Sequence, residues 1–182
     1  MIEWANTLMH RCMSLFTDLK ADYQANPYNL KGKYIACFYR IAHYFKRHKS
    51  RFVQIIGLPI VKLYEFSVMW VLGVEIDPRT RIGTGLRVPH GYVIVNPDTI
   101  IGRNVMIRQF TTIGNKGVPP WDSPVIGDNV EIGANSALIG KISIGDNVII
   151  GAGTILTKSV PANSVVYGNP IKIRLNQPAD IS

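Results

Sequence analysis

The stretch LRVPHGYVIV at residues 86–95 contains His90, the only histidine that follows His48 in the chain. A free histidine titrates near pH 6.5, so its neutral ring can accept a proton from a hydroxyl group at neutral pH. General-base assistance of this kind accelerates a reaction by about 10²–10⁴-fold. A lone histidine can equally be structural, and the surrounding elements must decide between the two interpretations.

Length and cysteine content place the chain in a broad class. Its 182 residues suffice for one domain, or for one domain with a smaller appendage. Cys12 and Cys37 lack metal-ligand spacing, so we expect reduced, buried thiols in a cytosolic protein and no metal site. The N-terminus lacks the basic segment and apolar run of a secretory signal. We therefore expect a cytoplasmic protein.

The net charge of +8 is concentrated in one segment. Between Tyr23 and Tyr64 there are eight basic residues and no Asp or Glu. Two apolar runs, 52–61 and 66–74, follow the basic sequence KRHKSR at 46–51, and neither run approaches the roughly 18 residues of a transmembrane helix.

Two interpretations of this segment remain open. It can form packed helices with a solvated basic face, or residues 31–62 can contact an anionic membrane surface at the inner face of the plasma membrane. Nucleic acid is not an expected partner, because no nucleic-acid-binding motif is present.

A six-residue repeat begins near residue 76. Aliphatic residues lead successive hexads such as IDPRTR, IGTGLR, IGRNVM, IGDNVE and IGDNVI, with Gly, Asn or Asp at the turns. Three hexads make one triangular coil, and stacked coils pair short strands in parallel. The repeat predicts a mainly β protein, a parallel β-helix of about four to five coils. We expect a helical domain over 1–74, the β-helix over 75–163, and a C-terminal cap and tail over 164–182.

Two irregularities interrupt the repeat. The unit VPHGYVI, which contains His90, has seven residues, and the step from Ile113 to Ile126 has thirteen and must extrude a loop. Binding surfaces of repeat proteins are often built where the repeat is irregular. Both irregularities are therefore candidate sites.

The hexads, together with VEIDPRTRIGTGLRVPHGYVIV and the ending GAGTILTKSVPANSVVYGNPIKI, resemble the left-handed β-helix acyltransferases of the serine acetyltransferase branch. FYRIAHYF at 38–45 resembles the same branch, and the short N-terminal region is most similar to its exopolysaccharide and colanic-acid members. The resemblance implies a homotrimer, acetyl-CoA in the groove between neighbouring β-helices, and direct acetyl transfer to a hydroxyl.

The resemblance also implies roles for residues near the first irregularity. His90 falls on the catalytic histidine and Glu75 on the acid that orients it, where the serine enzymes usually have Asp. Asp77 and Ser123 fall where those enzymes have further histidines, and both are candidate substrate contacts. Pro89 replaces the Asp that contacts serine, and proline cannot make that contact.

Further candidates concern the reacting thioester, the acceptor and acetyl-CoA. Backbone N–H groups around Ile113–Asn115 are candidates for stabilising the thioester oxygen. Trp121 in the extruded loop can stack on a sugar ring or anchor the loop. For acetyl-CoA, the resemblance implies three small residues beside the pantetheine arm: Gly114, Ala134 and Ala152. Asn115 is a further candidate contact, and Lys158 and Lys172 are candidates for binding the CoA phosphates. Each also fits an ordinary hexad corner or a solvated side chain.

These inferences favour an O-acetyltransferase acting on a sugar hydroxyl of an exopolysaccharide or capsule precursor, free or lipid-linked. Two alternatives stay open. One is a serine O-acetyltransferase of cysteine biosynthesis, which Pro89, Ser123 and the short N-terminal region oppose. The other is a non-catalytic trimeric scaffold, which the retention of His90 and Glu75 opposes.

Overall fold

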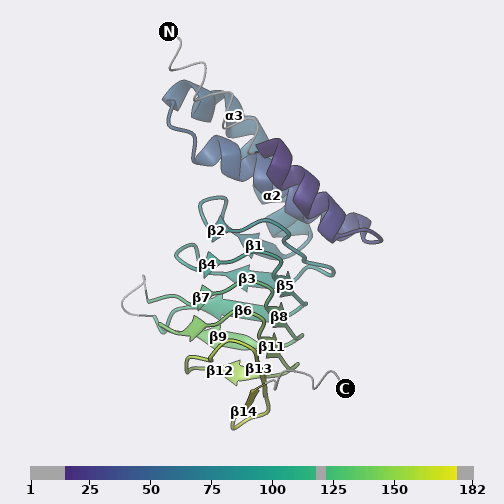
Figure 1. Ribbon diagram of the computed structural model, residues 1–182. Coiled ribbons are helices and arrows are strands. Elements are labelled where there is room, and N and C mark those ends of the chain that lie inside the picture. Colours follow the sequence, from purple (N-terminus) through teal and green to yellow (C-terminus); the bar gives the residue numbers. More distant parts are fainter. Residues whose placement is uncertain (1–14, 118–121, 176–182) are drawn as a thin grey trace.

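The computed structural model describes residues 15–117 and 122–175 (Figure 1). Cys12 and Trp121 lie outside these ranges. A helical layer lies at one end of a stack of short strands, and the described chain ends at the opposite end of the stack. The layer comprises a helix over 15–25, α2 (Leu30–Lys46), α3 (Arg51–Tyr64) and the π-helix η1 (Glu65–Val71).

The strands form three sheets, one on each side of a triangular coil. The first sheet contains β1 (Val74–Ile76), β3 (Val93–Val95), β6 (Thr111–Gly114), β9 (Ala137–Ile139) and β12 (Ile155–Leu156). The second contains β2 (Arg81–Ile82), β4 (Ile100–Ile101), β7 (Val125–Ile126) and β10 (Ser143–Ile144). The third contains β5 (Met106–Ile107), β8 (Glu131–Ile132), β11 (Ile149–Ile150), β13 (Ser164–Tyr167) and β14 (Lys172–Leu175). The predicted parallel β-helix is confirmed, with five strands in its first sheet.

The register of the first sheet confirms both predicted irregularities. Glu75 pairs with Ile94, 19 positions later, and Ile94 pairs with Thr112, 18 positions later. Thr112 then pairs with Ala137, 25 positions later. The first coil therefore carries one extra residue, between the bridge residue Arg87 and β3, and the third coil carries seven extra residues after β6.

Aliphatic residues point inward from every coil and form one continuous core. Ile76, Ile107, Ile132 and Leu138 are among its fully buried side chains. Asparagine occupies the left-handed backbone conformation at five corners, where its short polar side chain tolerates a positive φ: Asn104, Asn129, Asn135, Asn147 and Asn163. Four of these asparagines, all but Asn135, form a side-chain ladder from coil to coil, with Asn129 Nδ2 donating to Asn147 Oδ1 at 3.1 Å as one step. At the C-terminal end, β14 pairs antiparallel with β13 and ends the parallel ladder.

The helical layer hydrogen-bonds to the polar backbone groups of the first coil. Buried Asp22 accepts from the backbone N–H groups of Gly85 and Leu86 at 2.6 and 3.0 Å, and from Arg40 Nε at 2.6 Å. Arg40 also donates to the carbonyls of Ile82, at 2.7 Å, and Gly83. These backbone groups would otherwise be left without partners where the coil stack begins. The layer therefore stabilises the first coil in addition to covering it.

One part of the helical layer differs from the sequence-based expectation. The two apolar runs expected as separate segments form one helical stretch, Arg51–Val71, because Lys62 and Glu65 pair across one turn at 2.6 Å and remain on the surface. The stretch has 21 residues, and by length and composition it could cross a membrane. The inference that the apolar segments are too short for a span was therefore wrong.

Candidate active site

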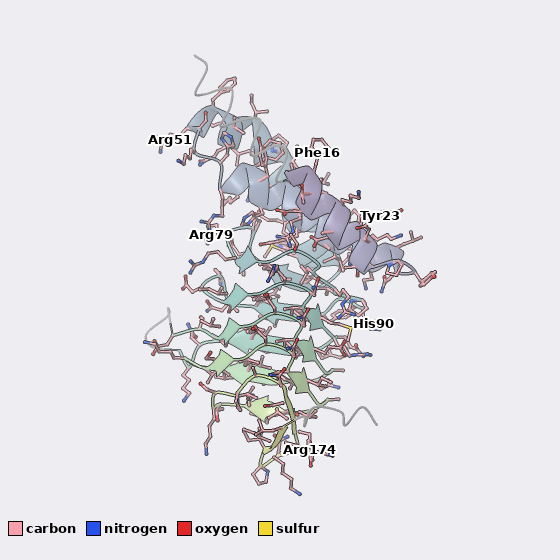
Figure 2. All side chains as sticks on the ribbon, in the orientation of Figure 1. Phe16, Tyr23, Arg51, Arg79, His90 and Arg174 are labelled. Atoms are coloured by element: carbon pink, nitrogen blue, oxygen red, sulfur yellow. The ribbon has the colours of Figure 1, made fainter. Side chains whose placement is uncertain are left out.

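His90 lies at the corner between the third and first sheets, within the seven-residue step. Figure 2 shows it on the flank of the β-helix, just below the helix that carries Tyr23. Its side chain is exposed, and it lies between Arg87, which bridges to the third sheet, and β3. Because solvent and ligands can reach the ring, the position is compatible with general-base chemistry.

The helical layer holds the backbone of this corner by its carbonyl groups. Asn29 Nδ2 donates to the Pro89 carbonyl at 2.9 Å, and Lys31 Nζ donates to the His90 carbonyl at 2.7 Å. Asn29 has a second role, since its side-chain oxygen caps α2 by accepting from Gly32 N–H at 2.8 Å. A cap residue and a lysine of α2 thus fix the backbone beside the candidate base.

Gly91, directly after His90, is required by the local geometry. Its φ is +82°, and a Cβ there would lie 2.6 Å from the Leu72 carbonyl oxygen and 3.1 Å from Lys31 Nζ. Any other residue would push the corner away from the helical layer. The glycine therefore helps to determine where the His90 ring is presented.

Glu75 lies on the outward face of the first sheet. It faces Ile94 in the neighbouring rung and borders two adjacent hollows, of about 400 Å³ and about 330 Å³. Among the described residues no hydrogen bond joins Glu75 to His90, and His90 lines neither hollow. The predicted pair therefore stays a prediction. Catalytic hydrogen bonds in ligand-free enzymes are often long and tighten only in the substrate complex.

Asp77 also borders the larger hollow, but its carboxylate is already engaged. It accepts from Arg79 N, Nε and Nη2 at 2.7, 3.0 and 2.9 Å. Burial raises the pKa of Asp77, but the hydrogen bonds from Arg79 and the charges of Arg79 and Lys46 outweigh it and hold that pKa below its ordinary value. Asp77 is thus an ionised acceptor held in a fixed orientation.

Gly114 is the last residue of β6, the central strand of the first sheet, and Asn115 follows it; both line the larger hollow. A Cβ on Gly114 would meet only Asn96 Cβ, at 3.9 Å, so packing does not require glycine there. An open glycine beside a hollow leaves room for a ligand to approach the backbone. Asn115 Oδ1 accepts from the N–H of Gly117 at 3.0 Å, which holds the chain where the extruded loop begins.

Ser123 is buried and does not face solvent. Its hydroxyl donates to Asn96 Oδ1 at 3.0 Å, and Asn96 in turn lines the larger hollow. Sequence reasoning named Ser123 as a substrate contact and missed Asn96. Asn96 lies in a regular hexad, so its sequence context does not distinguish it. Its hydrogen bond with Ser123 is what identifies it as part of the candidate site.

The remaining candidates for acetyl-CoA lie along two regions. Ala134 and Ala152 occupy equivalent corners of successive coils, on the same edge as His90, and the Ala134 carbonyl accepts from Gly153 N–H at 2.8 Å. Lys158 and Lys172 are exposed near the C-terminal end of the stack. One chain therefore places His90, Ala134 and Ala152 at the corners that precede strands of the first sheet, and Gly114 and Asn115 at the opposite, C-terminal end of a strand of the same sheet.

An aromatic pair beside His90 was missed by sequence reasoning. Tyr92 and Phe110 stack with ring centroids 5.5 Å apart, and both line the smaller hollow with Glu75. Both have positive φ values, 53° and 59°, at corners of the kind that elsewhere carry asparagine. Aromatic residues rarely adopt this backbone conformation. The sequence does contain a signal for this pair: Tyr92 and Phe110 are 18 residues apart, which is the length of one coil.

Comparison with known proteins finds relatives that share the hexapeptide repeat. Residues 123–158 match the family model "Bacterial transferase hexapeptide (six repeats)". The chain is 34% identical to the "Putative colanic acid biosynthesis acetyltransferase WcaB" of Escherichia coli, over 85% of this chain and 97% of that protein. It is 32% identical to serine acetyltransferase 2 of Arabidopsis thaliana, over 83% of this chain and 45% of the longer plant protein.

The solved structures agree on the fold. The soybean serine acetyltransferase apoenzyme superposes with a TM-score of 0.72 at 30% identity, over 88% of this chain and 69% of that chain. Together with the family match, this similarity shows that the β-helix is left-handed.

Proposed function

Since the chain belongs to the hexapeptide-repeat acyltransferase family, in the branch of the colanic acid and serine acetyltransferases, we propose that it transfers acetyl from acetyl-CoA to a sugar hydroxyl of an exopolysaccharide or capsule precursor. The relative matched over nearly its whole length carries a name in colanic acid biosynthesis. The observation that carries the choice of acceptor is Pro89. Its side chain offers no polar group to an amino acid, and its carbonyl is already bonded to Asn29.

In this mechanism His90 removes the proton of the acceptor hydroxyl as the oxygen attacks the thioester carbonyl of acetyl-CoA. A tetrahedral intermediate forms, and backbone N–H groups near Gly114 and Asn115 stabilise its negative oxygen. The intermediate then collapses, the carbon–sulfur bond breaks, and the CoA sulfur leaves with the proton from His90. Glu75 orients the ring and stabilises its protonated form. No covalent enzyme intermediate is required.

A homotrimer completes the site in this proposal. His90 lies at a corner that precedes a strand of the first sheet, whereas Gly114 and Asn115 lie where the central strand β6 ends and line a hollow that His90 does not line. If the His90 edge of one chain faces the Gly114 end of another, the base and the backbone donors meet in the groove between chains. Acetyl-CoA would lie in this groove, with Ala134 and Ala152 beside its pantetheine arm.

The acceptor distinguishes this function from the two alternatives. Release of free CoA thiol is measured with purified protein, acetyl-CoA and either L-serine or a panel of neutral and acidic sugars. The proposal predicts turnover with at least one sugar and none above background with L-serine. Turnover with serine alone contradicts it and favours serine O-acetyltransferase activity. Absence of both acetyl-CoA binding and turnover contradicts it and favours a scaffold.

A further inference from the structure

Within the described parts of the chain, the helical stretch Arg51–Val71 packs on the protein through one face. Gly57, Val61, Tyr64 and Val68 are its buried residues. A Cβ on Gly57 would lie 2.3 Å from the ring of Phe45, so glycine allows α3 to approach α2 closely. These four residues recur at three- and four-residue spacing and define the packed side of the stretch.

The opposite side is apolar and, among the described residues, uncovered. Phe52, Ile55, Ile56, Leu63, Phe66 and Trp70 are all more than half exposed, with Trp70 at 83%. The spacing of these six residues places them on one side of the stretch. The charged Lys62 and Glu65 are not among these residues. We call these six residues the outer face. A continuous apolar surface of this kind marks an interaction site.

Basic residues lie beside the outer face. Lys46, Arg47, Lys49 and Arg51 are exposed at the junction of α2 and α3, and Figure 2 shows Arg51 at the end of the helical layer farthest from the strands. Lys46, Lys49 and Arg51 form no ion pair with any described residue. The same region contains no Asp or Glu between Tyr23 and Tyr64.

A groove combines the two properties. It has a volume of about 380 Å³ and is lined by the apolar residues Ile55, Leu58 and Val61 together with Lys46 and Arg51. Apolar walls beside two cations match a molecule with a hydrocarbon chain and a negatively charged head. Phospholipids with anionic head groups have this chemistry.

We propose that the outer face and the basic residues 46–51 dock the protein on an anionic membrane surface. The apolar side chains enter the boundary between head groups and acyl chains, and the basic residues bind the lipid phosphates. The packed side, held on α2 and on the start of the β-helix, keeps the stretch lying along the surface, although its length would allow it to span. The inference is independent of the reaction that the protein catalyses. A second copy of the chain fits the face less well, since it would bring basic clusters together.

The test measures binding of the full chain to vesicles of phosphatidylcholine with or without phosphatidylglycerol, by sedimentation. We expect binding only when phosphatidylglycerol is present, and release in 1 M NaCl, where the screening length falls to about 3 Å. Equal binding to both vesicles, or no binding, overturns the proposal. Binding that persists in 1 M salt and after alkaline extraction indicates a spanning helix and also overturns it.

Variants assign the binding to this surface. Lys46→Gln/Lys49→Gln/Arg51→Gln should weaken vesicle binding about 100-fold, since each basic residue near an anionic leaflet contributes about fivefold. The charge-matched control Arg103→Gln/Lys141→Gln/Arg174→Gln, on the β-helix, should bind within about twofold of the unsubstituted protein. Equal losses in both variants would mean that net charge alone causes binding, and the proposal would be wrong.

A second pair of variants tests the apolar contribution. Leu63→Gln/Phe66→Gln/Trp70→Gln should weaken binding about tenfold or more, whereas Ile149→Gln/Ile173→Gln, also exposed and apolar, should not. Light scattering on the same samples gives the oligomeric mass. If the outer-face variant binds vesicles normally but changes its mass, the face is an interface between copies and the proposal fails.

Discussion

The buried pair of Asp22 and Arg40 offers a quantitative test of how the helical layer stabilises the first coil. The side chain of Asp22 is fully buried and that of Arg40 is 4% exposed, so the guanidinium depends on a protein counter-charge. Asp22→Asn keeps the shape and removes the charge, and its NH2 group would face donors, because Arg40 and two backbone N–H groups all donate to the Asp22 carboxylate. Breaking a buried pair from one side costs about 3–5 kcal/mol.

The lower end of this range applies here. Asp18 is a second carboxyl near Arg40: burial and the charge of Asp22 raise its pKa, and the charge of Arg40 lowers it in part, so loss of the Asp22 charge favours ionised Asp18 as a partial counter-charge. A loss of about 3 kcal/mol, with a urea dependence of about 2 kcal/mol per M, moves the unfolding midpoint down by about 1.5 M at fixed protein concentration.

Urea unfolding followed by circular dichroism measures this shift. The matched control is Asp98→Asn, because Asp98 is exposed and its side chain makes no hydrogen bond to a described residue. The control should keep its midpoint within about 0.3 M of the unsubstituted protein. If Asp22→Asn behaves like the control, the inference that this carboxylate stabilises the first coil is wrong.

Three further predictions follow from the site and its supports. Gly114→Ala should raise the KM for acetyl-CoA several-fold without lowering the unfolding midpoint, because a Cβ there meets only Asn96; an unchanged KM would remove Gly114 from the acetyl-CoA site. Lys31→Met should lower kcat while leaving stability nearly unchanged, because the substitution removes an exposed hydrogen bond to the His90 carbonyl and a cation–π contact 5.9 Å from the centre of the Tyr92 ring; unchanged kcat would show that Lys31 does not position the base. Burial lowers the pKa of His43, so the unfolded chain binds a proton more readily and stability falls as the pH drops below about 6.5. His43→Gln should therefore flatten the decline of the urea midpoint between pH 7 and 5, and an equally steep decline would contradict this assignment.

The β-helix could be predicted from the sequence because each coil repeats the same local rule. An aliphatic residue every six positions, with Gly, Asn or Asp at the corner, specifies the turn and the inward direction without knowledge of distant contacts. The seven-residue step at His90 and the thirteen-residue step after Ile113 are departures from that rule, and the strand register places both where the repeat predicts them.

The supports of the site could not be predicted in this way. Asp22 and Arg40 contact backbone groups 42–64 positions away, and no spacing rule connects a helix to the first coil of a stack. Asn96 and the stack of Tyr92 on Phe110 also depend on which corners lie above one another. The single helical stretch Arg51–Val71 was missed because Lys62 and Glu65 seemed to divide it, whereas they pair on its surface.

The most direct test of the central claim is the acetyl-transfer rate of His90→Ala with a sugar acceptor that the unsubstituted protein uses. If the exposed ring at this corner is the general base, kcat falls by about 10²–10⁴-fold while the Kd for CoA stays within about twofold, since the proposed role of the ring is proton transfer and not the anchoring of CoA. A His90→Ala protein that transfers acetyl at the unsubstituted rate would contradict the assignment of His90 as the base.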